Sequence, residues 1–196
     1  LVGAGGDYIA STSIGIIGDP NPDYKLSGIN SITYKSLTFR FQVDYTHGGD
    51  MYSSTARSLL ARGVTKDTEF DRAAPYILPG VTADGKPNNI QISATQGYFN
   101  NVFGPDQGGI FDATVVRLRD MSLSYALPEK LLNKTPFGSV SITANGSNLW
   151  YYAPNFPKYM HFDPETNGLG VGNGKGLEFI TGPSARRMGL SVRITF

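Results

Sequence analysis

Five segments of this chain alternate between apolar and polar residues, and this pattern limits the fold more than any other feature. In residues 185–196 one face takes Met188, Leu190, Val192, Ile194 and Phe196, while the other is polar or glycine. A period of two over such a length predicts a strand with one apolar and one polar face. We expect further strands at residues 24–34, 37–47, 111–126 and 138–149. The phase shift near Arg119 and Asp120 in the third of these predicts a β-bulge.

The connections between these strands alternate in length. Residues 35–36 and 127–137 are short, whereas residues 48–110 and 150–184 are long and rich in Gly, Pro and Asn. Short turns on one side and long loops on the other are typical of bacterial outer-membrane barrels. Residues 1–23 are then the end of a further external loop. A helical signal at residues 53–62, from a Ser start to the stop at Gly63, predicts a short helix that decorates a loop and builds no core.

The expected fold is an all-β, antiparallel transmembrane β-barrel. Five strands are too few to close a wall, because bacterial barrels have eight or more and a free edge in lipid is costly. The missing strands are therefore expected upstream of Leu1 or in a separate piece of the same chain. Leu1 is not an initiator Met and no signal peptide precedes it, which suggests a processed or incomplete chain. A soluble secreted β-sandwich that binds glycans predicts the same alternation and remains the alternative.

Composition excludes several other classes. The chain has 17 basic and 16 acidic residues and a net charge of +1, so nothing favours nucleic acid as a partner. The chain also has no cysteine, which excludes disulfides, Cys-based zinc sites and thiol nucleophiles. No apolar run approaches the ~18 residues of a membrane-spanning helix.

Four groups of motifs, taken in order, resemble the SusC-like (SusC/RagA) family of TonB-dependent outer-membrane transporters. They are residues 17–24 (IGDPNPDY) followed by 34–37 (YKSL), 116–128 (VRLRDMSLSYALP), 148–150 (NLW) with 162–165 (FDPE), and the alternation that ends at Phe196. The resemblance covers nearly the whole chain. The long loops depart from it, so the nutrient and the identity of the lid protein are left open.

The resemblance implies that these residues are the last five or so strands of a barrel of about 22 strands. It implies import of a bulky nutrient, an oligosaccharide or a peptide, rather than an enzymatic activity. The expected partners are the rest of the barrel with its plug, a SusD-like surface lipoprotein, the TonB complex and outer-membrane lipid. The plug and the TonB motif are absent from these residues. Phe196 is expected to be the assembly signal of the barrel as well as an interfacial aromatic.

Two sets of residues are candidates for contact with solute. Aromatic rings suit stacking on sugars or peptide side chains, and the loop aromatics expected to contact substrate or lid are Trp150, Tyr151, Tyr152, Tyr159 and Phe162. The polar faces of the strands are expected to face the lumen, where they contact solute or form a wall bridged to the plug. These lumen-facing residues are Arg40, Asp44, Arg117, Arg187 and Arg193.

No catalytic residue and no cofactor are predicted. The two histidines, His47 and His161, lack partners at the spacing of a metal site or a catalytic triad. Asp163, Glu165 and Asn167 copy the opening of a calcium loop, but Pro164 interrupts it and the twelfth position lacks the usual Glu. A rigid turn is the favoured interpretation of this segment, with calcium as the second.

Overall fold

A computed structural model describes residues 1–169 and 172–196; the remaining two residues, inside the predicted loop 150–184, lie outside the description. The chain folds as two compact units. The first unit contains Leu1–Asn21, Gly49–Ala113 and Asn155–Gly182, and the second contains Pro22–Gly48, Thr114–Pro154 and Pro183–Phe196. We call them the loop unit and the sheet unit and describe each by itself.

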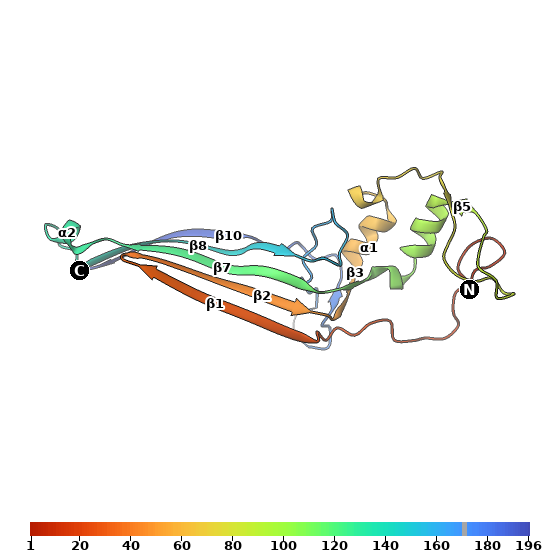
Figure 1. The fold of residues 1–196 in the computed structure, drawn as a ribbon, viewed down its shortest axis with the longest axis horizontal. Helices are drawn as coiled ribbons and strands as arrows, with labels where there is room; N and C mark the ends of the chain where they lie inside the picture. The colour runs from red at the N-terminus through yellow and green to blue at the C-terminus, as the bar shows by residue number, and fades with distance from the viewer. Residues whose placement is uncertain (170–171) are drawn as a thin grey trace. The chain divides into compact units, whose positions relative to one another are not determined.

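The sheet unit is one antiparallel layer of five long strands that follow one another in sequence (Figure 1). The strand order is β1–β2–β7–β8–β10, so β1 and β10 are the two edges within this sheet. The bounds are β1 Tyr24–Tyr34, β2 Leu37–His47, β7 Val115–Ala126, β8 Ser139–Tyr152 and β10 Arg187–Thr195. Two strands, β1 and β2, have the same bounds as the sequence pattern.

The predicted β-bulge is confirmed at Arg119. Gln42 pairs with Asp120 while the next residue, Val43, pairs with Leu118, so Arg119 has no counterpart on β2. The register between β7 and β8 shifts at the same place. The extra residue keeps the apolar side chains of β7 on one face before and after the shift.

Two predicted strand limits were wrong by three residues or more. Residues 110–112 do not begin β7; they form a separate strand, β6 (Ile110–Asp112), which pairs with β3 in the loop unit. The strand predicted to end at residue 149 continues as β8 to Tyr152, because its last residues pair with Val116, Arg117 and Leu118 of β7. The loop that follows β8 therefore begins later than expected.

One face of the sheet is apolar and open to the surroundings. Partners in register share a face, so this face carries side chains from all five strands, which include Leu26, Ile32, Leu123, Ile142, Leu190 and Val192. These side chains are all exposed; Leu190, for example, is 74% exposed. Among the described residues of this unit, no second sheet lies on the face. A soluble β-sandwich would cover it, since that fold buries the inner faces of two sheets.

The turns alternate as predicted between the two ends of the sheet. At one end, β1 and β2 are joined by a two-residue turn in which Lys35 has φ +53, a left-handed conformation that such hairpins favour. The connection from β7 to β8 at the same end contains the short helix α2 (Glu129–Leu132), and β10 also ends there. At the other end, β2 leads into β7 and β8 into β10 through the long segments that build the loop unit.

The loop unit combines short strands with an α-helix (α1), two 3-10 helices (η1 and η3) and a π-helix (η2). Its three-stranded sheet has the order β6–β3–β9, and β4 pairs with β5. The elements are β3 Asp50–Ser53, α1 Ser54–Ala61, η1 Lys66–Thr68, β4 Pro75–Tyr76, β5 Ile92–Ser93, η2 Thr95–Val102, η3 Asp106–Gly109, β6 and β9 Leu177–Glu178. Helix α1 follows the capping residue Ser53, whose hydroxyl accepts the Ala56 N–H, and it is followed by Gly63 at φ +65. The predicted start and stop signals are confirmed.

The expectation that this helix builds no core was wrong. Ala56 and Leu60 of α1 are buried with Met51 of β3 and with Leu78 and Phe99 from the same long segment. The residues between β2 and β7 thus have an apolar core of their own. Composition alone suggested an irregular loop, because the core residues are few and widely spaced along the chain.

No helix among the residues that the structure describes has the length and hydropathy needed to cross a membrane.

Candidate functional site

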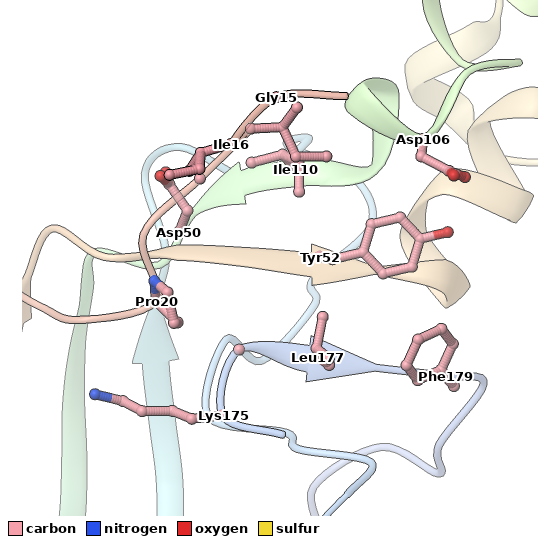
Figure 2. Close-up of a pocket in the computed structure, with 13 residues that line it drawn as sticks. Gly15, Ile16, Pro20, Asp50, Tyr52, Asp106, Ile110, Lys175, Leu177 and Phe179 are labelled. Carbon is pink, nitrogen blue, oxygen red and sulfur yellow. The ribbon is translucent and has the colours of Figure 1, made fainter. Parts of the chain in front are cut away.

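The loop unit contains an open groove with a volume of about 510 Å³ (Figure 2). Three parts of the chain form its walls: residues 15–20, strands β3 and β6, and residues 175–179. Apolar side chains line its centre, namely Ile16, Ile17, Tyr52, Ile110, Leu177 and Phe179. The rings of Tyr52 and Phe179 have their centroids 5.7 Å apart. Asp50, Asp106 and Lys175 contribute the charged groups. A groove of this size is within the range of small-ligand sites.

The charged groups of the groove already have partners that hold them in place. The Asp50 carboxylate accepts the Asp19 N–H at 2.9 Å. Asp106 forms an ion pair with Arg57 at 3.2 Å, although its side chain is 73% exposed. Lys175 Nζ donates to Asn21 Oδ1 at 3.1 Å. Each group keeps hydrogen-bonding capacity for a ligand, because a carboxylate accepts several hydrogen bonds and an ammonium donates three.

The N-terminal wall of the groove is fixed at both ends and open between them. At its start, the Asp7 carboxylate accepts hydrogen bonds from Asn101 at 2.7 Å and from Gln96 at 2.9 Å. These hydrogen bonds hold the pKa of Asp7 below its usual value. At its end, Asp19 and Asp50 are joined by two hydrogen bonds. Between these anchors Ile14 and Ile16 are almost fully exposed, at 104% and 97%.

The opposite wall is held by a buried carboxylate, Glu178 of β9. Its side chain is 0% exposed and accepts hydrogen bonds from the hydroxyls of Ser53 at 2.7 Å and Thr55 at 2.6 Å. The backbone N–H groups of Thr55 and Thr181 also donate to it, at 3.0 and 2.7 Å. Glu178 thereby ties the segment after β8 to the first turn of α1, where the positive end of the helix dipole favours a negative charge.

These contacts keep Glu178 ionised. Burial by itself raises the pKa of this carboxyl, but the hydrogen bonds from Thr55, Thr181 and Ser53 outweigh burial and lower it below the usual value of a glutamate. A carboxyl with a lowered pKa in the folded state stabilises that state fully above its usual pKa, and the stabilisation is lost as the pH falls through the folded-state pKa.

We therefore expect the loop unit to loosen in acid through Glu178. Cleavage of residues 48–110 and 150–184 by pepsin should rise as the pH falls below about 4, after correction for the pH dependence of pepsin itself. The variant Glu178→Gln, which has no carboxyl to titrate at this position, should show a smaller pH dependence. Equal pH dependence in both proteins would exclude Glu178 as the cause.

The structure separates three of the aromatic residues predicted to contact substrate or lid. Trp150, Tyr151 and Tyr152 are in β8 and not in a loop. Trp150 and Tyr152 pair with Leu118 and Val116 and lie on the apolar face, whereas Tyr151 pairs with Arg117 on the polar face. The three side chains therefore do not share one surface, because alternate residues of a strand point to opposite faces. Their contact with substrate or lid stays a prediction.

The other two predicted aromatics are in the loop unit. Tyr159 is exposed, its N–H donates to the Asp67 carboxylate at 3.1 Å, and Lys66 and Lys158 lie 5.1 and 5.3 Å from the centre of its ring. Phe162 stacks on Phe156 with a centroid distance of 5.3 Å. Phe156 stacks in turn on Phe111. Phe162 therefore belongs to an internal stack, and neither residue lines the groove.

The residues predicted to face the lumen all lie on the polar face of the sheet. Arg40, Arg187 and Arg193 are exposed there. Asp44 accepts hydrogen bonds from Ser27 at 2.6 Å and from Gln42, and it pairs with Arg119 at the bulge. Sequence reasoning did not find this role of Arg119.

Arg117 is 2% exposed, in contrast to the other arginines of that face. It donates to Asn148 Oδ1 at 3.2 Å and lies 5.4 Å from the centre of the Tyr151 ring. Arg117 is thus a packed part of the polar face, and a solute would not meet it directly.

The remaining candidates have ordinary local surroundings. Phe196, the expected assembly signal, is 86% exposed and contacts Phe137 edge to face at 5.5 Å. Asp163 accepts the Glu165 N–H at 3.0 Å, as in the rigid turn favoured for the segment that includes Asn167. In the described part of the chain, no three His, Asp or Glu residues are grouped so that they could hold a metal ion.

The groove and Glu178 were not found from the sequence. The residues of the groove come from three distant segments, and the motif at residues 17–24 does not indicate that these segments meet. One signal was present: the exposed alternation of Ile14 and Ile16 beside glycines, in a segment interpreted only as the end of a loop.

Comparisons with known proteins agree with the motifs. No protein-family model matches the chain. It is 26% identical over 198 residues to TonB-dependent receptor P3 of Formosa agariphila. This alignment covers 98% of this chain and 18% of the receptor. It is also 26% identical over 199 residues to TonB-dependent receptor P26 of the same organism. That alignment covers 97% of this chain and 19% of the receptor. The chain thus spans about a fifth of the length of these relatives.

Solved structures with a similar fold include those of RagAB. The open-open state of the RagAB peptide importer aligns with a TM-score of 0.55 at 16% identity, over 90% of this chain and 17% of the solved one. The closed-closed state gives a TM-score of 0.52 at 17% identity, over 87% and 17% of the two chains. At such identity the likeness shows the fold alone. The neighbours in both comparisons are receptors and transporters rather than enzymes.

Proposed function

Because the resemblance to SusC-like TonB-dependent transporters is confirmed, we propose that the chain serves TonB-dependent import of a bulky nutrient across the outer membrane. In this proposal the sheet unit is part of the barrel wall and the loop unit belongs to the external surface that meets solute and lid. The observation that carries it is the exposed apolar face of a sheet whose long connections all leave from one end. Lipid is the natural cover for such a face.

A complete wall needs more strands than this chain contributes. Both edge strands, β1 and β10, would leave unpaired N–H and C=O groups in the membrane, which costs several kcal/mol for each group. Further strands of the same protein therefore pair with these edges, in a closed barrel of about 22 strands. Strands of 9 to 14 residues are long enough to cross a bilayer when tilted.

The resemblance to the family implies the mechanism. A SusD-like lipoprotein closes over the external loops, solute is captured between loops and lid, and force from the TonB complex on the plug opens a path through the barrel. The RagAB neighbours, described as a peptide importer, support a peptide as one nutrient class, and an oligosaccharide is the other. This segment contributes wall and loops and no chemical step.

The first test concerns the wall. This chain has no cysteine of its own. Single spin labels can be attached to cysteines introduced at residues 190, 191, 192 and 193 of the full receptor in liposomes, after any cysteine elsewhere in the receptor is replaced. We expect labels at 190 and 192 to collide mostly with oxygen, which dissolves in lipid, and labels at 191 and 193 to collide mostly with a polar nickel chelate. A soluble sandwich gives low oxygen accessibility at 190 and 192, because a second sheet covers that face.

The second test concerns energy coupling. Cells that carry the full receptor should deplete a tryptic digest of serum albumin or a maltodextrin mixture from the medium, and deletion of TonB should abolish this uptake. Uptake that does not depend on TonB would exclude the proposed function, whatever the labels show about the wall.

A further inference from the structure

The groove of the loop unit has a chemistry that separates the two nutrient classes. Its centre is formed by the aliphatic side chains of Ile16, Ile110 and Leu177 and by the rings of Tyr52 and Phe179 (Figure 2). The aliphatic groups offer no hydrogen-bond partners. A sugar seated among them would bury hydroxyl groups without partners, and each such group would oppose binding. An apolar side chain has no such cost.

The charges of the groove fit a peptide. Figure 2 shows Asp106 beyond the Tyr52 hydroxyl and Lys175 on the other side of the labelled cluster. Asp106 is suited to an ammonium or a basic side chain, and Lys175 to a carboxylate, because both keep free hydrogen-bonding capacity. A peptide carries both groups together with apolar side chains, whereas a neutral oligosaccharide carries neither charge.

The wall formed by residues 15–17 is suited to closing over a bound chain. Ile16 lines the groove but is 97% exposed. Gly15 has open space where a side chain would be. The anchors at Asp7 and Asp19 lie on either side of this stretch. A rotation about Gly15 that placed Ile16 on a ligand would bury this apolar side chain, which favours binding.

We propose that this groove is a subsite for an extended oligopeptide, with a large apolar side chain seated between Ile16, Ile110 and the two rings. The inference rests on the proposed function, since it assigns the imported solute to the loop unit. Asp106 and Lys175 set the direction of the peptide through its charged groups.

The test uses the full receptor, purified in detergent, and a tryptic digest of serum albumin as the probe. Bound peptides are identified and quantified by mass spectrometry, and a maltodextrin mixture serves as the competing class. We expect the wild type to enrich peptides that contain Leu, Ile or Phe. The variants Ile16→Asp and Phe179→Ala should weaken this enrichment by about tenfold, as central contacts of a binding site usually do.

The matched control is Ile14→Asp, which makes the same change two residues away. Ile14 is fully exposed and does not line the groove, so its variant should bind peptides as the wild type does. Equal losses in Ile14→Asp and Ile16→Asp would overturn the proposal. Unchanged binding in Ile16→Asp, no enrichment by the wild type, or enrichment of maltodextrin instead would overturn it as well.

A surface for the lid protein is the competing explanation of an exposed apolar groove. It predicts that Ile16→Asp reduces the co-purified lipoprotein and leaves peptide binding unchanged, an outcome that also overturns the proposal. Loss of peptide binding is measured on the purified receptor, separately from TonB-dependent uptake in cells. If the peptide-binding assay contradicts the proposed subsite, the proposed import function can still hold. The import function is contradicted only by the uptake assay in cells.

Discussion

Replacing Glu178 with alanine is expected to release the segment after β8 from helix α1 while the strands of the wall stay folded. The change leaves donors of Ser53, Thr55 and Thr181 without their acceptor in a buried place. An unsatisfied buried donor costs about 1–3 kcal/mol, so the loss should be about 3 kcal/mol or more even if water enters the space. Hydrogen exchange of residues 53–61 and 175–182 in the purified receptor should rise strongly.

Two variants make this result specific. Glu178→Gln keeps the shape but replaces one acceptor oxygen by a donor, so its effect should lie between those of the wild type and the alanine variant. Glu69→Ala removes an exposed carboxylate of the same unit and should change the exchange little. If Glu178→Ala and Glu69→Ala behave alike, Glu178 does not hold the loop unit together.

A positive charge on the apolar face of the sheet should prevent correct assembly of the wall. Leu190 lies near the middle of β10, on the face shared with its partner Ala144, and is 74% exposed. In an outer-membrane barrel, arginine at the bilayer midplane costs about 2–4 kcal/mol. We expect Leu190→Arg to reduce the amount of folded receptor in outer membranes, measured by electrophoresis of unheated samples.

The control is the next residue of the same strand. Ser191 points to the polar face, so Ser191→Arg should assemble like the wild type. Assembly of both variants at the wild-type level would show that neither face meets lipid, and the proposed position of the sheet unit in the membrane would have to be abandoned.

The sheet was predictable because its information is local. Each strand carries its own alternation, and a neighbour needs only to match it in register, as β1 and β2 do. The bulge was predictable for the same reason, since Arg119 interrupts the phase within one segment. The extension of β8 to Tyr152 was missed because aromatic residues at a strand end resemble a loop that binds solute. Pairing with β7 extends β8 to Tyr152.

The loop unit was not predictable because its contacts join distant segments. Glu178 is an ordinary glutamate in the sequence, and only the fold brings Ser53 and Thr55 to it across more than a hundred residues. Likewise Ile16 and Leu177 line one groove but belong to segments with different local patterns. Loops of this kind have no regular alternation of apolar and polar residues from which burial could be predicted. Composition therefore suggested an irregular loop where the structure has a core.

The hydrogen bonds of Glu178 also limit how such a protein can be altered by exchanging parts. The groove is built from the segment before β1, the segment between β2 and β7 and the segment between β8 and β10, and two of these depend on one carboxylate. A chimera that receives only one foreign segment would lose the matching partner and, with it, the shape of the groove. With the groove as the proposed peptide subsite, cargo preference should be inherited and engineered as a set of three insertions, transplanted together onto an unchanged sheet unit.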